Sequence, residues 1–163
     1  MRVSVRVPAT SANLGPGFDA LGLALSLYND VEVVAGTGLT VRIEGEGAGR
    51  LPLTDRNVVV RGIALVHEAV GRAFAGGVVT CVNRIPPARG LGSSAAALVG
   101  GLVAGNALLG GPLSREALLG LAARAEGHPD NVAAALLGGL TVSCSEGDGA
   151  TAITLRVPTS VRW

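Results

Sequence analysis

The segment that most constrains the fold of this chain runs from Ile85 to Leu109. It begins IPPARGLGSSAAAL, in which a proline pair precedes the glycine-rich stretch Gly90-Leu91-Gly92-Ser93-Ser94. From Gly92 to about Leu109 the residues are mostly alanine, glycine, leucine and valine, and none is charged. Such a run predicts a helix that is buried all round, because it offers no polar face to water. The glycine-rich loop therefore leads into the N-terminus of a core helix.

A loop of this kind favours an anion. The backbone N–H groups of a first helical turn have no partner within the helix, and they lie at the positive end of the helix dipole. The hydroxyl groups of Ser93 and Ser94 can add contacts to phosphate oxygens or to Mg²⁺. A plain helix start, with serine as the N-cap and the glycines as a turn, is the structural alternative.

Three known loop types fit this segment poorly. A P-loop is excluded, because it needs a lysine and the chain contains none. A dinucleotide fingerprint is formally matched by residues 90–95, but residues 86–89 separate it from the preceding strand, and Glu116 falls on a predicted helix. A nucleophile elbow at residues 92–96 would need His128 and Asp130, two positions apart, to complete a triad. The last two types remain open as weak alternatives.

Composition excludes several classes of function. The net charge is +1, no basic run is present and only two Phe, one Tyr and one Trp occur, which argues against nucleic-acid binding. The N-terminus MRVSVRVPA alternates like a strand and is not a signal peptide, and no apolar run is long enough to span a membrane. We therefore expect a soluble, cytoplasmic protein with an aliphatic core. Cys81 and Cys144 lie in apolar runs and are predicted to be buried free thiols.

Hydrophobic periodicity predicts strands and helices without regular alternation, which is typical of an α+β fold. Strands are expected at residues 3–7 (ended by Pro8), 28–35, 40–44, 78–85, 140–144 and 152–157. The strands at 28–35 and 40–44 are predicted to form a meander or hairpin through Gly36 and Gly38. Helices are expected at residues 57–74, 92–109 and 114–126, with a short one from residue 129. Ser114 is predicted to be an N-cap, and His67 to be structural.

The amino-acid sequence of the loop closely resembles the ATP-binding signature of the GHMP kinases, a superfamily that phosphorylates small alcohols. In that family the loop wraps the phosphates through backbone amides and needs no lysine. The resemblance implies that ATP is bound by Pro86, Pro87, Ala88, Arg89, Gly90, Leu91, Gly92, Ser93, Ser94, Ala95 and Ala96. It also implies a position on the adenine side for Asn57, at the head of its predicted helix.

Two further motifs resemble the homoserine kinase branch of this superfamily: PATSANLGPGFD at residues 8–19 and EGHPDN at residues 126–131. Homoserine carries an ammonium group that suits a carboxylate such as Asp19, and polar oxygens that suit a donor such as Asn13. Asn and Asp are also ordinary turn residues, which is the structural alternative for this pair. The resemblance implies substrate contacts from Asn13, Asp19, His128 and Asn131.

The resemblance further implies catalytic roles for Glu126, His128 and Asn131, with Mg²⁺ held by Ser94 and Glu126. Magnesium prefers hard oxygen ligands and keeps several waters, so one hydroxyl and one carboxylate are sufficient protein ligands. Asn131 stands where sugar- and mevalonate-directed members are expected to carry an aspartate base. An amide cannot act as a base, so the proton acceptor stays open.

The family implies a fold of the ribosomal protein S5 domain 2-like type, a mixed sheet backed by helices. We expect residues 1–150 to form the ATP-binding N-terminal domain, and residues 151–163 to begin a C-terminal domain that is truncated or absent. The implied reaction is ATP-dependent phosphorylation of L-homoserine to O-phospho-L-homoserine, in threonine biosynthesis. Another small-alcohol kinase, or a non-catalytic nucleotide-binding fragment, is the alternative. Family members are often homodimers, but the sequence indicates no interface.

Overall fold

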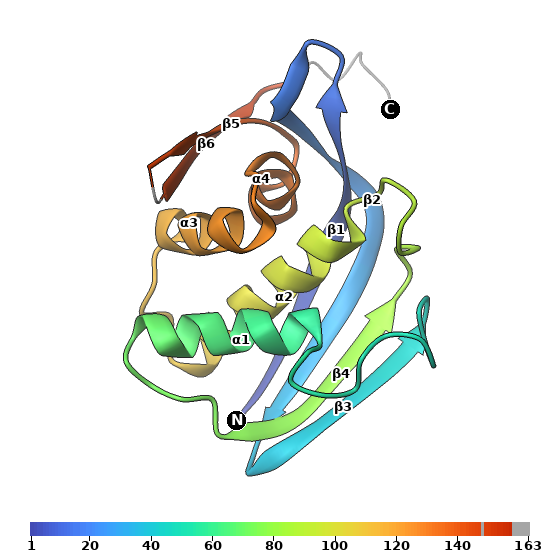
Figure 1. Cartoon of the computed structure of the whole chain (residues 1–163), viewed down its shortest axis with the longest axis vertical. Coiled ribbons are helices and arrows are strands. Elements are labelled where there is room, and N and C mark those ends of the chain that lie inside the picture. Colours follow the sequence, from blue (N-terminus) through green and yellow to red (C-terminus); the bar gives the residue numbers. More distant parts are fainter. Residues whose placement is uncertain (148, 158–163) are drawn as a thin grey trace.

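The structure is a computed structural model that describes residues 1–147 and 149–157. The helices and strands follow one another along the chain as Figure 1 labels them. The strands are β1 (Arg2–Leu14), β2 (Gly17–Ala35), β3 (Gly38–Gly45), β4 (Gly76–Asn83), β5 (Leu140–Glu146) and β6 (Gly149–Leu155). The helices are α1 (Val58–Ala69), α2 (Ser93–Leu108), α3 (Arg115–Glu126) and α4 (Asp130–Leu137).

The strands form one mixed sheet in the order β3-β4-β2-β5-β6, and β1 pairs with β2. The long strand β2 is antiparallel to β1, β4 and β5, while β3 is parallel to β4. The four helices lie together on one side of the curved sheet, with α2 between α1 and the α3–α4 pair (Figure 1). This arrangement confirms the predicted α+β class and the predicted mixed sheet backed by helices.

Helix α2 lies in the middle of the core, as its composition predicts. A Cβ atom on Gly101 would lie 2.1 Å from the Val59 carbonyl oxygen, and one on Gly62 would lie 2.6 Å from the Leu98 carbonyl oxygen. The glycines therefore allow the backbones of α1 and α2 to approach closely. Adding one methyl group at such a contact typically costs about 1–3 kcal/mol of stability. The small residues of the 92–109 run thus set the spacing of the two central helices.

Strand β1 continues past Pro8, which the sequence pattern had placed at its end. Pro8 pairs with Tyr28, and the ladder resumes at Thr10 and Ala24 after a register shift. Proline is tolerated here because β1 pairs only with β2 in the described part of the chain, so the missing N–H interrupts no second ladder. The strand thereby carries residues 9–14 to the site.

The predicted hairpin of residues 28–35 and 40–44 is wrong. Strand β4 lies between β2 and β3, pairing antiparallel with β2 and parallel with β3. The parallel pair is joined through α1, which is the long crossover that parallel strands require. A local glycine-rich connection suggested a hairpin, but β4, which follows only after helix α1, pairs with both strands.

Among the remaining predictions for single residues and helix ends, some are confirmed and others are wrong. The Ser114 hydroxyl accepts the Ala117 N–H at 3.2 Å, which confirms the cap, and His67 is buried with its Nδ1 2.9 Å from the Ile63 carbonyl oxygen. Helix α1 ends at Ala69 rather than near residue 74. Both cysteines are free, but only Cys81 is buried; Cys144 is exposed because the outer end of β5 is uncovered.

Strand β6 crosses residue 150, the predicted limit of the N-terminal domain, and pairs with β5. Residues 158–163, part of the predicted start of a C-terminal domain, lie outside the described residues. Within the described part of the chain no helix is both long and apolar enough to cross a membrane.

Candidate active site

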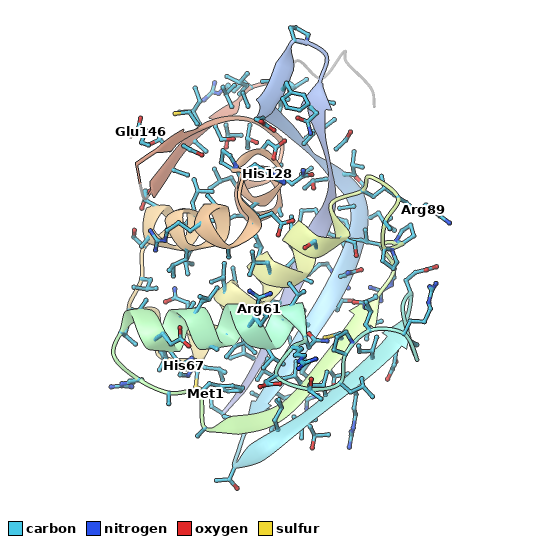
Figure 2. The ribbon with its side chains drawn as sticks, in the orientation of Figure 1. Met1, Arg61, His67, Arg89, His128 and Glu146 are labelled. Atoms are coloured by element: carbon cyan, nitrogen blue, oxygen red, sulfur yellow. The ribbon has the colours of Figure 1, made fainter. Side chains whose placement is uncertain are left out.

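The phosphate-loop candidate, residues 84–92, joins β4 to α2. Ala88, Gly90 and Gly92 all adopt left-handed backbone angles, with φ of 58°, 70° and 63°. Gly92 occupies the N-cap position of α2, and no side chain caps the helix there. The first N–H groups of a long buried helix are therefore left for an external acceptor, which is the arrangement that favours an anion. Arg89 extends outward from the loop (Figure 2).

The structure disfavours both weaker loop types. Strand β4 ends at Asn83, so the glycine-rich stretch does not follow a strand directly as a dinucleotide fingerprint requires. His128 pairs with Asp130, and the serine hydroxyls bind elsewhere: Ser94 to Glu126 and Ser93 to the Ile85 carbonyl. The geometry of a Ser-His-Asp triad is therefore not formed.

The two predicted magnesium ligands meet in space. The Ser94 hydroxyl, in the first turn of α2, donates to Glu126 Oε2 at 3.2 Å. Glu126 is the last residue of α3, and Gly127 ends that helix with a φ of 96°. A carboxylate near a helix C-terminus is electrostatically unfavourable on its own, so its position beside the α2 N-terminus calls for a cation or a positive dipole. Among the described residues, the His, Cys, Asp and Glu side chains form no cluster of three or more that could hold a metal ion.

The EGHPDN motif forms the turn from α3 into α4. Asp130 is fully buried, and its Oδ1 accepts the Asn131 N–H at 2.8 Å and faces His128 Nδ1 at 2.5 Å. When Nδ1 carries the ring proton, it donates to Asp130 Oδ1, because a carboxylate oxygen is an acceptor. Asp130 Oδ2 has no hydrogen-bond partner among residues 1–147 and 149–157. His128 lies where α4 begins (Figure 2).

Asn131 lies against the phosphate loop. Its Oδ1 accepts the Thr10 hydroxyl at 2.8 Å and lies 3.2 Å from the point that a Cβ on Gly92 would occupy. The Thr10 N–H also donates to the Leu91 carbonyl oxygen at 3.1 Å. Strand β1, the loop and α4 therefore converge at one point.

The Asn13–Asp19 pair stands on the β1–β2 hairpin. The Asp19 N–H donates to Asn13 Oδ1 at 2.9 Å, and both residues are exposed. Both adopt positive φ angles, 58° for Asn13 and 55° for Asp19, which are uncommon outside glycine. The amide oxygen of Asn13 thus holds the tight turn, while the Asp19 carboxylate is left available at the hairpin.

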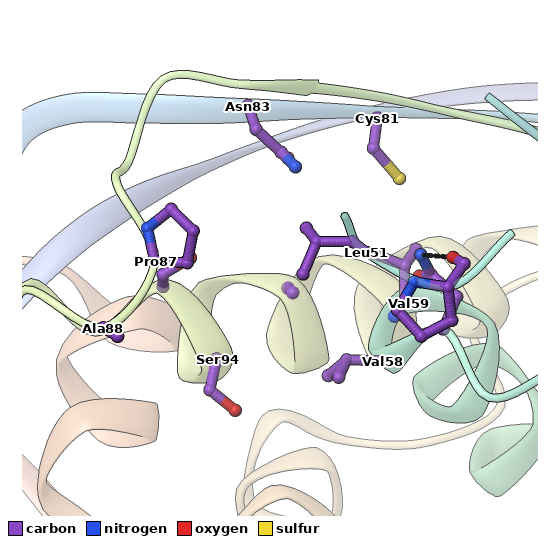
Figure 3. Close-up of a pocket in the computed structure, with 12 residues that line it drawn as sticks. Leu51, Val58, Val59, Cys81, Asn83, Pro87, Ala88 and Ser94 are labelled. Atoms are coloured by element: carbon purple, nitrogen blue, oxygen red, sulfur yellow. Dashed lines mark hydrogen bonds between the residues drawn. The ribbon is translucent and has the colours of Figure 1, made fainter. Parts of the chain in front are cut away.

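A cavity of about 200 Å³ adjoins the loop (Figure 3). Its walls come from the 51–59 segment, from β4, from the loop through Pro87 and Ala88, and from the first turns of α2, which include Ser94. Asn57 lines the cavity and caps α1: its Oδ1 accepts the Val59 N–H and its Nδ2 donates to the Pro52 carbonyl, each at 2.9 Å. Cys81 also faces the cavity, and burial raises the pKa of its thiol to about 11. The apolar lining suits a flat heterocycle.

The residues that sequence reasoning missed are Thr10, Asp130 as a partner of His128, and the cavity residues Leu51, Pro52 and Cys81. Thr10 lies inside the PATSANLGPGFD motif and Asp130 inside EGHPDN, so both motifs contained the signal. No local pattern marked the cavity residues.

The fold and the loop together define an α+β domain. Its candidate phosphate site consists of backbone amides at a helix N-terminus and contains no lysine. The sequence profile described as GHMP kinases N terminal domain matches residues 57–139, about half of the chain. The chain belongs to this family.

Individual relatives point to one branch of the family. The chain is 52% identical to the homoserine kinase of Streptomyces avermitilis over 163 residues, which is 98% of this chain and 53% of that protein. It is 53% identical to the homoserine kinase of Streptomyces coelicolor over the same shares. The crystal structure of homoserine kinase from Cytophaga hutchinsonii superposes with a TM-score of 0.82 at 33% identity, covering 96% of this chain and 52% of that one. The chain thus spans about half the length of the relatives that it matches.

Proposed function

We propose that the protein to which this chain belongs transfers the γ-phosphoryl group of ATP to the side-chain hydroxyl of L-homoserine. The observation that carries the proposal is the contact between Ser94 and Glu126, 3.2 Å apart beside the open N-terminus of α2. The similarity to homoserine kinases supports the choice of alcohol. In the reaction the alcohol oxygen forms a bond to the γ-phosphorus, the bond from that phosphorus to the β–γ bridging oxygen breaks, and ADP leaves. The hydroxyl proton passes to a phosphate oxygen or to water, since an amide such as that of Asn131 is not a base.

For the nucleotide, the amides at the start of α2 bind the phosphates, and the cavity beside the loop takes the adenine. Asn57 fixes the shape of the cavity wall, because its amide is hydrogen-bonded both to the first turn of α1 and to the Pro52 carbonyl. Pro87 and Ala88 line the cavity while the loop continues to Gly92, so base and phosphates share one continuous surface.

Magnesium fits the pair of Ser94 and Glu126. A hydroxyl and a carboxylate are hard oxygen ligands, and their separation leaves most of the coordination sphere to phosphate oxygens and water. When bound, Mg²⁺ neutralises negative charge on the β- and γ-phosphates. Glu126 supplies the protein's negative charge for it, and Ser94 links that carboxylate to the α2 N-terminus.

For the alcohol, we assign the ammonium group to Asp19, with Asn13 shaping the turn and offering its amide. His128 and Asn131 bind near the reacting hydroxyl. Asn131 orients and donates but cannot take the proton, since an amide is not a base. Phosphoryl transfer needs mainly positioning and charge stabilisation, which these residues supply.

The test is a coupled assay of ADP release on the full-length protein with homoserine, shikimate, mevalonate and galactose as acceptors. We expect turnover with homoserine at a kcat/KM at least about tenfold above the others, because an acceptor without an ammonium group leaves the Asp19 carboxylate unpaired. Turnover with a different alcohol would show that this alcohol, and not homoserine, is the substrate, and it would leave the kinase family unchanged. Binding of ATP and Mg²⁺ by calorimetry, with no turnover on any acceptor, would favour a non-catalytic nucleotide-binding domain.

The cytoplasmic location, the place in threonine biosynthesis, the homodimer and the domain limit at residue 150 remain predictions that accompany this proposal.

A further inference from the structure

We propose that Thr10 is a positioning residue that fixes the orientation of the Asn131 amide, so that Asn131 presents its NH₂ group to the reacting phosphoryl group or alcohol. The proposal rests on the proposed function, because it assigns how Asn131 serves that reaction. Thr10 itself is fully buried and is not expected to touch either substrate.

Thr10 is tied to the two other parts of the site at once. Its N–H donates to the Leu91 carbonyl oxygen at 3.1 Å, and its hydroxyl donates to Asn131 Oδ1 at 2.8 Å. The first bond holds the loop one residue before the α2 N-cap, and the second holds the side chain of α4. One residue of β1 therefore sets the spacing of the loop and Asn131.

The bulge in the β1–β2 ladder brings Thr10 to this place. Pro8 pairs with Tyr28 but Thr10 pairs with Ala24, so β2 contains extra residues at this point and the register shifts. Bulges next to active sites commonly re-aim a side chain. Here, next to the register shift, the Thr10 N–H donates to the loop and not to a neighbouring strand.

Gly92 shows how closely the three parts approach. A Cβ atom on Gly92 would lie 1.9 Å from Thr10 Oγ1 and 3.2 Å from Asn131 Oδ1. The hydroxyl of Thr10 thus occupies the space beside the N-cap of α2, and the oxygen of Asn131 lies next to it. The amide of Asn131 is therefore adjacent to the α2 N-terminus, where we expect a phosphate to bind.

The direction of the Thr10–Asn131 bond decides what Asn131 can do. Because Oδ1 accepts from Thr10, the NH₂ group points away from Thr10, and no hydrogen bond from Nδ2 is present within residues 1–147 and 149–157. An NH₂ group stabilises the negative charge that spreads over the phosphoryl oxygens in the transition state. Without the hydroxyl, the amide can rotate and present its oxygen, which repels those oxygens. The Thr10 hydroxyl therefore acts on kcat through Asn131.

The experiment compares Thr10→Val with Thr10→Ser in the full-length protein, using the acceptor that the wild type phosphorylates. Valine keeps the shape of threonine without its hydroxyl, and serine keeps the hydroxyl. We expect Thr10→Val to lower kcat about tenfold, with the KM for ATP changed less than about threefold, while Thr10→Ser stays within about threefold of wild type in both. In a Thr10→Val/Asn131→Ala double variant the two losses should be less than additive, because both remove one interaction.

Thr141→Val is the matched control, since Thr141 is also fully buried and its hydroxyl donates to a backbone carbonyl, that of Gly22, at 3.2 Å. It should lose stability without the selective fall in kcat. Should Thr10→Val fail to fold, Thr10→Ala removes the same hydroxyl with less crowding and must show the same kcat loss.

Equal kcat losses in Thr10→Ser and Thr10→Val, or full additivity with Asn131→Ala, would overturn the positioning role. Absence of wild-type turnover on every acceptor would instead contradict the proposed function, so the two failures are distinguishable.

Discussion

The phosphate side and the alcohol side of the candidate site are built differently. On the phosphate side, contacts join residues far apart in the chain: Thr10 to Asn131 and Ser94 to Glu126, from strand β1 and helices α2, α3 and α4. On the alcohol side, Asn13 and Asp19 are exposed and are bonded to each other across six positions of one hairpin. The first is held by the core of the domain, and the second by its own turn.

This difference indicates which part of the reaction the chain can perform alone. Every element that we assign to ATP and Mg²⁺ lies within the described residues and is fixed by the fold. Beyond His128 and Asn131, of which Asn131 borders the phosphate loop, the alcohol side offers only the Asn13–Asp19 pair on an exposed hairpin among the described residues. We therefore expect nucleotide binding to be a property of this chain, and alcohol specificity to depend on more of the protein.

The largest effect is expected at Gly92, on the phosphate side. Gly92→Ala forces a non-glycine residue to a φ of 63° and places a methyl carbon 1.9 Å from Thr10 Oγ1. Strain and overpacking together should lower the free energy of unfolding by on the order of 3 kcal/mol, as measured by urea denaturation. Gly90→Ala is the matched control: its φ is 70°, but nothing lies within 4 Å of the added carbon. Equal losses for the two variants would show that the close packing of Thr10 against the loop is unimportant.

Glu126→Gln should affect the chemistry and spare the fold. Removing the charge that we assign to Mg²⁺ should lower kcat about 100-fold, on the order of 3 kcal/mol at the transition state. The midpoint of thermal unfolding should stay constant or rise slightly, because Glu126 ends a helix, where a negative charge is unfavourable. Ser94→Ala should show a smaller loss in the same direction. Near-normal turnover of Glu126→Gln at saturating ATP would remove the metal assignment.

Asp19→Asn should change only the alcohol side. Loss of a charge-assisted contact to the ammonium group should raise the KM for homoserine by roughly 10- to 100-fold, with the KM for ATP unchanged in steady-state assays. Glu68→Gln, at an exposed carboxylate of α1 outside the cavity lining, is the control and should change neither constant. An equal rise in both Michaelis constants would mean that the hairpin also supports the phosphate side.

The smallest effect is expected at Asp30, on the long strand β2. The Arg6 guanidinium, and then that of Arg84, hydrogen-bond to this carboxylate and hold its pKa below the usual range. A lowered folded-state pKa adds stability above the unfolded pKa, and this is lost as pH falls through the folded value. Because the pairs are solvent-screened, Asp30→Asn should cost roughly 0.5–1 kcal/mol at pH 7. That difference should vanish in urea denaturation near pH 2, and a difference that persists there would point to packing.

Sequence reasoning succeeded where the determining interactions were local. The Ser114 cap, the start of α2 after Gly92 and the alanine-rich core helix depend on neighbours within a few positions. The two residues that the motifs predicted as magnesium ligands, Ser94 and Glu126, are in contact, and their role as ligands stays a prediction.

It failed where distant strands decided the outcome. Pro8 was expected to end a strand, but it lies on one that pairs on a single side. The sequence of residues 28–35 and 40–44 suggested a hairpin, but in the sheet β4 lies between these two strands. The Thr10–Asn131 bond spans 121 positions and follows from a register shift that no local pattern records. The exposure of Cys144 likewise depends on what covers β5.

The most direct test of the account is whether Glu126 links ATP binding to Mg²⁺ in this chain. The measurement is the Kd for ATP by calorimetry, with and without Mg²⁺, for the wild-type chain and for Glu126→Gln. We predict that Mg²⁺ tightens binding at least about tenfold in the wild type and less than about threefold in the variant, because the variant loses the only charged protein ligand assigned to the ion. An equal effect of Mg²⁺ on both proteins would contradict the assignment of Glu126 to the ion.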